Sequence, residues 1–353
     1  MFRASKGAVG TWVVVCVAAA PLAFAAPSIS GVAGGLSAGQ TVTITGSGFG
    51  NKTKPQPVLW DDFERGAIGK QIQDVPAAIG HWDTGAGSEN VTYTGAKAHT
   101  GRMAARHDFI QPYIASLSKN MTFTRLYMDF WMVVDYVDIK SRNFKPWRLY
   151  GDNDNYQLDY LWMCNSNALG RVQANANLEV NSWGGPQYSN GGWMHIQLVY
   201  NESSPGQANG TVRHYINSEV AGLDSSGVLT ENGPAHFDQI RIGHYWDQPS
   251  DASCPGNGGA VVYVDDVYID TSWARVELGN ASTYAASTHR EIQVARTWAD
   301  GSVSVNFNPG TFAAGSTAYL FITDANNITS RGIPVQIGGV AAAPAAPTNV
   351  SVH

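Results

Sequence analysis

The stretch Gly192-Trp-Met-His-Ile-Gln-Leu-Val-Tyr200 places large apolar residues at every second position. Successive side chains of a β-strand point to opposite faces, so the even-numbered positions from Met194 to Tyr200 share one face. His195 and Gln197 share the other face. A sustained period of two predicts a strand with one side in a hydrophobic core.

Strand signals of the same kind run through most of the chain, and turn residues separate them. The chain has 38 Gly and 16 Pro, 11% of its residues are aromatic, and only 14% are charged. No stretch longer than two helical turns shows a convincing period of 3.6 residues. Short strands at this spacing are typical of β-sandwiches, so we predict an all-β fold. The strongest further strand segments are 125–134, 156–163, 210–220, 237–245 and 261–269.

The first 26 residues have the layout of a secretory signal peptide. Arg3 and Lys6 precede an apolar stretch at 8–20, and Ala23-Phe-Ala25 matches an A-x-A cleavage site. The apolar stretch is shorter than the roughly 20 residues that a membrane-spanning helix needs. We therefore expect a mature protein that is secreted or held at the cell surface, with no membrane span after cleavage. Its oligomeric state is left open.

Charge and cysteine content narrow the partners further. The formal net charge is −6, and it becomes −8 once Arg3 and Lys6 leave with the signal. An acidic protein is a poor match for a phosphate backbone, so nucleic acid is not expected as a partner.

Two cysteines in an oxidising compartment usually pair. We expect a Cys164–Cys254 disulfide, with two free or buried thiols as the alternative.

Family resemblances suggest how the strands are organised. Gly39-Gln-Thr-Val-Thr-Ile-Thr-Gly-Ser-Gly-Phe-Gly50 resembles the opening hairpin of IPT/TIG immunoglobulin-like domains. Val58-Leu-Trp-Asp-Asp-Phe-Glu-Arg-Gly66 resembles the first strand of concanavalin-A-like (laminin-G-like) jelly rolls, and 261–270 resembles their last strand. Ala274-Arg-Val-Glu-Leu-Gly-Asn280 then resembles the third strand of the IPT/TIG-like domain.

These resemblances imply a jelly-roll β-sandwich inserted into a small immunoglobulin-like β-sandwich. A lone hairpin of about 25 residues cannot form a sandwich, and insertion requires only that the ends of the guest domain lie close together. Three sequential units are the alternative. The expected boundaries are 1–26 for the signal peptide, 27–57 plus 272–338 for the IPT/TIG-like domain, 58–271 for the jelly roll, and 339–353 for a Pro/Ala linker and tail.

The jelly-roll resemblance implies a concave sheet face that binds extended extracellular polysaccharide. Sugar rings stack their apolar faces on Trp and Tyr, and their edges need polar partners. The alternative for every aromatic residue is a plain place in the core, although aromatics among turn residues are harder to explain by burial. The candidate carbohydrate-binding residues are Trp131, Trp147, Tyr150, Trp183, Tyr188, Tyr245 and Trp246.

A polysaccharide lyase is the enzyme class that the residue types fit best. β-Elimination from a uronate needs a base for the C5 proton, a cation or amide for the carboxylate, and an acid for the leaving oxygen. The Gln-Ile-His and Tyr-x-Lys-x-Gly-x-Tyr runs of known lyases are absent, as is the Glu-x-Asp-x-x-Glu run of laminarinase-like hydrolases. For His195, a solvated strand position is the alternative. The candidate catalytic residues are His195, Tyr160, Arg148 and His244.

The same resemblance implies a structural Ca²⁺ between the first and last strands of the jelly roll. Carboxylate and carbonyl oxygens suit this ion. Asp62 and Glu64 open the domain and Asp265 lies in its last strand. We expect the metal at these three residues, with solvated strand ends as the alternative.

Three functions therefore stay open. The first is a secreted, polysaccharide-binding or adhesive protein, and the signal and the IPT/TIG-like part favour a bacterial source. The second is an extracellular lyase that acts on an acidic glycan. The third is a purely structural surface or matrix protein whose aromatic residues only fill its core.

Overall fold

A computed structural model describes residues 25–109, 114–135, 144–151, 156–162, 170–174, 181–184, 191–231, 236–246 and 261–341. These residues form β-strands joined by turns, with only single-turn 3₁₀ helices such as Ile72–Asp74 and Ser88–Asn90. The prediction of an all-β fold is confirmed. Within the described part of the chain, no helix is long and apolar enough to cross a membrane. The predicted signal peptide lies almost wholly outside the described residues.

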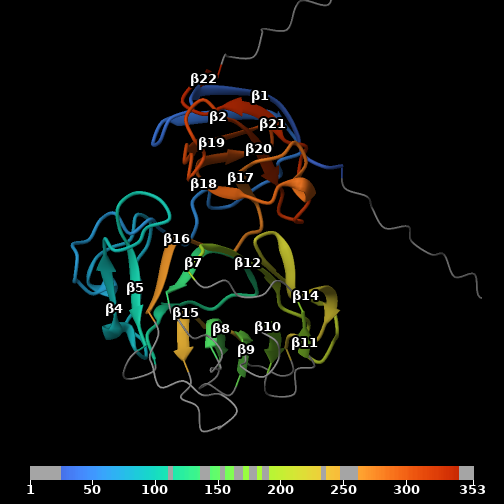
Figure 1. Cartoon of the computed structure of the whole chain (residues 1–353). Coiled ribbons are helices and arrows are strands. Elements are labelled where there is room, and N and C mark those ends of the chain that lie inside the picture. The colour runs from blue at the N-terminus through green and yellow to red at the C-terminus, as the bar shows by residue number, and fades with distance from the viewer. Residues whose placement is uncertain are drawn as a thin grey trace, which may run out of the picture.

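The middle of the chain forms a sandwich of two antiparallel sheets, the inserted sandwich (Figure 1). We call its sheets the near sheet and the far sheet, by their distance from the rest of the protein. The near sheet has the order β14 (Glu219–Val228), β13 (Gly210–Ile216), β12 (Met194–Asn201), β7 (Arg125–Asp135), β16 (Val261–Asp270), β5 (Ala104–Asp108) and β4 (Val91–Thr94), with β3 (Leu59–Asp61) also on β16. The far sheet has the order β11 (Asn181–Trp183), β10 (Gly170–Ala174), β9 (Tyr156–Trp162), β8 (Phe144–Gly151), β15 (Gln239–Trp246) and β6 (Leu117–Asn120).

The core of the inserted sandwich follows the alternation of its strands. Ile196 and Leu198 of β12 are fully buried, and they pack in one cluster with Leu149 of β8 and Ile240 of β15. His214 of β13 also lies in this core and links the two sheets. Its Nδ1 is 2.7 Å from the carbonyl oxygen of Ala221, and the Trp147 indole donates to its Nε2 over 3.1 Å.

The two ends of the chain form a second sandwich, the supporting sandwich. Its core includes the fully buried Val42, Ile44, Leu320 and Ile322. Its strand path is β21 (Ile333–Gln336), β20 (Thr317–Thr323), β17 (Arg275–Gly279), β18 (Arg290–Ala299), β19 (Ser302–Asn306), β2 (Thr41–Ser47), β1 (Ser28–Gly35) and β22 (Val340–Ala341).

Strand pairing shows that the supporting sandwich is built from both ends of the chain. The β2 strand pairs antiparallel with β19, from Thr41 opposite Asn306 to Thr45 opposite Ser302. The β1 strand pairs with β22. All strands of the inserted sandwich lie between β2 and β17 in the sequence. The signal-proximal hairpin therefore takes its partners from the C-terminal part of the chain.

The near sheet packs against β18 of the supporting sandwich, at a contact that we call the domain seam (Figure 1). Tyr127, Val199 and Tyr268 project from the near sheet and pack in one cluster with Ile292 and Val294 of β18. Both faces of the near sheet are therefore covered. The far sheet lies on the opposite side of the molecule, away from the seam.

We predict that Ile44→Ala destabilises the supporting sandwich by about 2–5 kcal/mol, because it empties a fully buried site in that core. Amide hydrogen exchange followed by mass spectrometry should then accelerate in β20, which is remote in sequence. Ile68→Ala is the matched control, since Ile68 is 73% exposed. Unchanged exchange in β20 would contradict a shared core.

Candidate functional site

The structure places His195 and Trp131 at the domain seam. The Nε2 atom of His195 lies 2.8 Å from Oδ1 of Asp129, and the imidazole stacks on the Trp131 indole at 4.6 Å between ring centroids. The opposite side of that indole stacks on His99 at 3.8 Å. Because His195 and Trp131 are only 1% and 6% exposed, neither offers an open face to a polysaccharide.

Tyr160 and Trp147 belong to the core of the inserted sandwich. Both are fully buried, and Tyr160 packs against His214 at 4.2 Å between ring centroids. The alternation of β9 explains this: Gln157 and Asp159 point out of the core, so Tyr160 points in. His195, Tyr160 and Arg148 therefore do not meet in one groove, because they lie at the seam, in the core and on the far sheet. Their catalytic roles stay a prediction.

The outer face of the far sheet carries a cluster of two arginines and one tyrosine. Arg148 and Tyr150 lie on β8, and Arg241 lies opposite Arg148 on β15. The guanidinium carbons of Arg148 and Arg241 are 4.6 and 4.2 Å from the centroid of the Tyr150 ring. Cation–π contacts of this kind fix long side chains. Tyr150 is 5% exposed, so its ring positions the guanidinium groups rather than offering a bare stacking surface.

Hydrogen-bonding side chains surround this cluster. Asp159 of β9 lies 3.3 Å from Nε of Arg148, and Gln157 accepts a hydrogen bond from Nη2 of the same arginine. On the other side, Gln239 accepts from Nε of Arg241 over 2.5 Å and donates to Oδ1 of Asn120 over 2.6 Å. Arg148 is thus paired with a carboxylate, and Arg241 with the amide oxygen of Gln239.

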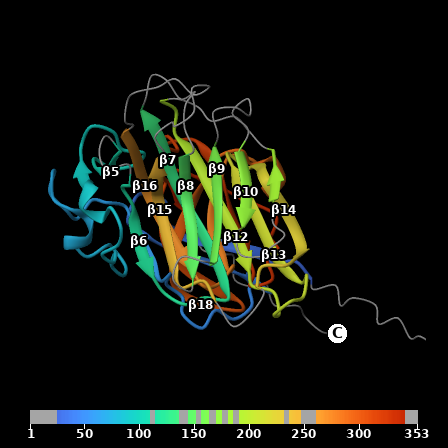
Figure 2. The same ribbon diagram turned by 90° about the horizontal axis from the view of Figure 1, so that it is seen from below.

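A cavity of about 640 Å³ opens beside the cluster, and Tyr150, Gln239, Arg241 and Asn120 are among the residues that line it. In Figure 2, strands β15, β8, β9 and β10 lie side by side and present this face to the viewer. We call Arg148, Tyr150, Arg241 and the side chains around them the far-face cluster. It combines cationic, amide and carboxylate groups, and its Arg148 and Asp159 side chains are 11% and 1% exposed.

Several predicted residues lie outside the described part of the structure. Tyr188, Cys164 and Cys254 are not described at all, so the disulfide stays a prediction. The backbones of His244, Tyr245 and Trp246 belong to β15 and that of Trp183 to β11, but their side chains are outside the described residues.

The acidic residues of the expected calcium site accept hydrogen bonds from backbone amides. Oε1 of Glu64 accepts from the amides of Arg102 and Met103, and Oδ2 of Asp265 accepts from those of His99 and Thr100. Oδ1 of Asp62 accepts from the amide of Glu64 itself. These oxygens are directed at N–H groups rather than at one shared cation position. Calcium stays a prediction that none of these contacts supports.

Two other groups of histidine and carboxylate side chains come close together among the described residues. One joins His99 and Asp266 to Glu291 of the supporting sandwich, and it contributes to the seam, with Nδ1 of His99 2.9 Å from Asp266. The other consists of Glu202, Glu231 and His236. Hydrogen bonds within the chain join His99 to Asp266 and His236 to Glu202, so we assign these contacts structural roles.

Arg241, Gln239 and Asn120 are site residues that sequence reasoning missed. The segment Gln239-Ile-Arg-Ile242 does contain the signal, because Ile240 and Ile242 alternate with polar residues. Only the pairing of β15 with β8 shows that Arg241 lies next to Arg148.

Comparison with known proteins finds fold similarity alone. No family model matches the chain, and no curated protein matches it either. Among solved structures, it is similar to the alginate lyase Aly36B, with 12% identity, TM-score 0.44, and coverage of 61% of this chain and 97% of that chain. It is also similar to the endo-β-1,4-glucuronan lyase of the fungus Trichoderma reesei, with 13% identity, TM-score 0.41, and coverage of 62% and 97%.

A third similar structure is the alginate lyase of the marine animal Aplysia kurodai, with 10% identity, TM-score 0.40, and coverage of 52% of this chain and 87% of that chain. At these identities and TM-scores, the similarities assign no activity to this chain. The IPT/TIG resemblance of the supporting sandwich stays a prediction.

We predict that the fold loses stability in acid partly through His214. Burial lowers the pKa of His214 to about 4, against an ordinary value of 6.5. The unfolded chain therefore binds more protons between these values, and stability present above pH 6.5 is lost as the pH falls toward 4. The loss from this residue should reach about 3 kcal/mol.

Denaturant unfolding at a series of pH values checks this prediction. His214→Gln removes the titrating group, so the free energy of unfolding should fall less steeply with acidification. His81→Gln, which changes a side chain that is 66% exposed, is the control. An unchanged slope in the His214→Gln variant would rule out the buried neutral imidazole as the cause.

Proposed function

We propose that the far-face cluster binds an acidic polysaccharide at the cell exterior. The observation that carries this proposal is the pair of guanidinium groups, Arg148 and Arg241, held on both β8 and β15 by one tyrosine ring. A planar guanidinium donates two parallel hydrogen bonds to a carboxylate, which a neutral sugar lacks. The glycan expected here therefore carries uronate groups.

The place of the cluster in the fold supports the same proposal. The supporting sandwich packs on the near sheet, so the far sheet faces away from the seam (Figures 1 and 2), and the cavity beside Tyr150 and Arg241 offers a glycan a place on this face. Gln157, Gln239 and Asn120 provide amides for hydroxyl groups near that cavity. The supporting sandwich then acts as a rigid mount, and the predicted signal peptide agrees with export.

We predict that Arg241→Gln weakens retention on an immobilised acidic polysaccharide such as polyglucuronate or alginate by about tenfold, the effect of one lost charged hydrogen bond. Retention should also fall with added salt, because exposed charges are screened. Affinity electrophoresis or a column assay measures both effects, with a neutral β-glucan as the reference ligand.

Arg106→Gln is the matched control, because Arg106 lies on β5 of the near sheet and pairs with Asp108. Equal losses in the two variants would show that total charge, and not the far face, governs retention. No retention of the wild type on any acidic glycan would leave the purely structural reading.

A polysaccharide lyase is the second candidate, and the Tyr150 hydroxyl group favours it. This residue carries an ionisable oxygen on the same face as two cations, and tyrosine is one of the side chains that serve as general bases. In an elimination, the phenolate form of this oxygen would take the C5 proton while a guanidinium stabilises the carboxylate. The C4–O bond would then break, and the phenol would return the proton to the leaving oxygen.

We predict that, if elimination occurs, Tyr150→Phe lowers its rate by about 10²–10⁴-fold while it leaves polysaccharide retention intact. Ultraviolet absorbance of the unsaturated uronate product measures the reaction. Retention without any unsaturated product in the wild type would remove the lyase and leave the binding protein.

A further inference from the structure

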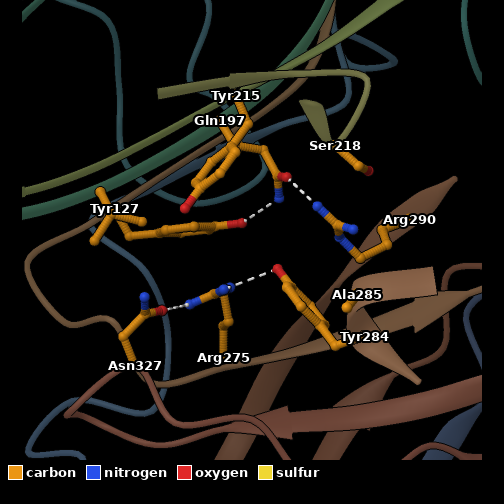
Figure 3. A pocket seen from close by; sticks show the side chains of 10 residues that line it. Tyr127, Gln197, Tyr215, Ser218, Arg275, Tyr284, Ala285, Arg290 and Asn327 are labelled. Atoms are coloured by element: carbon orange, nitrogen blue, oxygen red, sulfur yellow. Dashed lines mark hydrogen bonds between the residues drawn. The ribbon is translucent and has the colours of Figure 1, made fainter. Parts of the chain in front are cut away.

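A second polar cavity lies at the domain seam, on the opposite side of the inserted sandwich from the far-face cluster. Its volume is about 300 Å³, which corresponds to roughly ten water molecules. Both sandwiches contribute to its lining. Figure 3 shows Tyr127, Gln197 and Tyr215 of the near sheet pointing toward Arg275 and Arg290 of the supporting sandwich.

The lining of this seam pocket carries an excess of positive charge. Arg275 and Arg290 are each 4% exposed, and the described lining residues include no carboxylate. One carboxylate behind the lining, Glu277, serves both cations: its Oε2 accepts from Nε of Arg275 over 2.8 Å, and its Oε1 lies 3.3 Å from Nε of Arg290. Burying charge is costly unless it is paired, so an anion in this pocket would be stabilised.

Both guanidinium groups keep hydrogen-bonding capacity toward the pocket. Arg275 donates to Trp273, Asn327 and Tyr284 as well as to Glu277, which uses four of its five N–H bonds. Nη1 of Arg290 donates to the carbonyl of Ser287, and its Nη2 donates to Gln197. Nη1 and Nη2 of Arg290 therefore each keep one N–H bond for a ligand.

Ser218 adds a hydroxyl that the protein itself does not use. Its Oγ is buried and, among the described residues, has no hydrogen-bond partner. It also has a positive φ of 70°, next to Asn217 with φ of 51°. Serine at such a position is strained relative to glycine. Both positive φ values belong to the two-residue hairpin turn between β13 and β14, so the observation that points to a ligand is the unpaired hydroxyl in the pocket lining.

The remaining lining fits the body of a sugar. The Tyr215 ring is fixed at the pocket because its hydroxyl donates to Asp224 over 2.9 Å. With Val199, it offers an apolar surface to C–H groups, while the Asn327 amide nitrogen faces hydroxyls. Burial raises the pKa of Tyr127 and of Tyr284, so their hydroxyls stay neutral at physiological pH.

We propose that the seam pocket binds a single hexuronate residue, either a free monosaccharide or the end of a chain. Its carboxylate would lie at Arg275 and Arg290, its ring against Tyr215, and one hydroxyl at Ser218. This site shares only its ligand class with the proposed function, because none of its residues belongs to the far-face cluster. A ligand held here contacts both sandwiches and therefore ties them together.

Calorimetric titration of the full-length mature protein with D-glucuronate tests the proposal, with D-glucose as the probe that differs by the carboxylate alone. Glucuronate should bind and raise the thermal midpoint, since a ligand of the folded state stabilises it, and glucose should do neither. A short oligoglucuronate distinguishes a chain-end site from a monosaccharide site. Binding of glucose or inorganic sulfate as tight as that of glucuronate would overturn the proposal.

Ser218→Gly is the sharpest variant, because it removes the unpaired hydroxyl and suits the positive φ. It should fold at least as well as the wild type and weaken glucuronate binding about tenfold. Arg290→Gln should abolish binding, and its folding is checked by circular dichroism. Unchanged affinity in Ser218→Gly, or in a folded Arg290→Gln variant, would contradict the assignment.

Hydrogen exchange separates this site from the far face. Glucuronate should slow exchange in segments 210–218 and 284–290 and leave 144–151 and 239–242 unaffected. The Arg241→Gln variant should bind glucuronate as the wild type does, even where it loses polysaccharide retention. Protection confined to the far face would overturn the seam pocket but support the far-face proposal, whereas protection at the seam without any polysaccharide retention would support the pocket alone.

Discussion

The pairing of β2 with β19 is the constraint on which the rest of the molecule depends. Five residue pairs join 41–45 to 302–306, so the supporting sandwich closes only when both ends of the chain have met. Everything between β2 and β17 must then leave and return at one side of that sandwich. The inserted sandwich is thereby attached through two chain crossings, which restricts its rotation far more than one linker would.

Two crossings bring the near sheet against β18, and polar side chains accompany the apolar cluster in this contact. Nε2 of Gln197 lies within hydrogen-bond distance of Tyr127 and Asp129 in its own sheet and of Glu277 across the seam. Its Oε1 accepts from Arg290, so one amide joins both sandwiches. Buried polar groups stabilise only when their hydrogen bonds are satisfied. Such a network accepts one relative position of the two sandwiches and few others. The supporting sandwich thus packs on the middle strands of the near sheet, and the far sheet lies on the side away from the seam.

The fold was largely predictable from local pattern, whereas the site was not. Alternation in 192–200 correctly puts Ile196 and Leu198 on one face of the strand and His195 and Gln197 on the other. The same rule puts Tyr160 and Asp159 on different faces of β9. Alternation distinguishes two faces but does not say what covers each of them. His195 was expected on a solvated or catalytic face, and it lies under a second domain because the covering strand, β18, follows about 95 residues later in the sequence. The prediction that Trp131 binds carbohydrate meets the same difficulty. Strand β7 has aromatic side chains on both faces because both of its faces are buried.

The negative charge of the whole chain limits where an acidic glycan can bind, so the two arginine clusters matter most. A protein with a formal charge of −6 repels polyanions at long range, but in physiological salt this field fades over about 8 Å. Only groups in direct contact can then hold an acidic glycan. In the seam pocket Glu277 contacts both Arg275 and Arg290, whereas on the far face Asp159 contacts Arg148. In each place the carboxylate fixes the geometry of the arginine that it contacts. A protein that is acidic except at these arginine clusters binds most polyanions weakly. The arrangement of a few arginine N–H groups then selects the glycan.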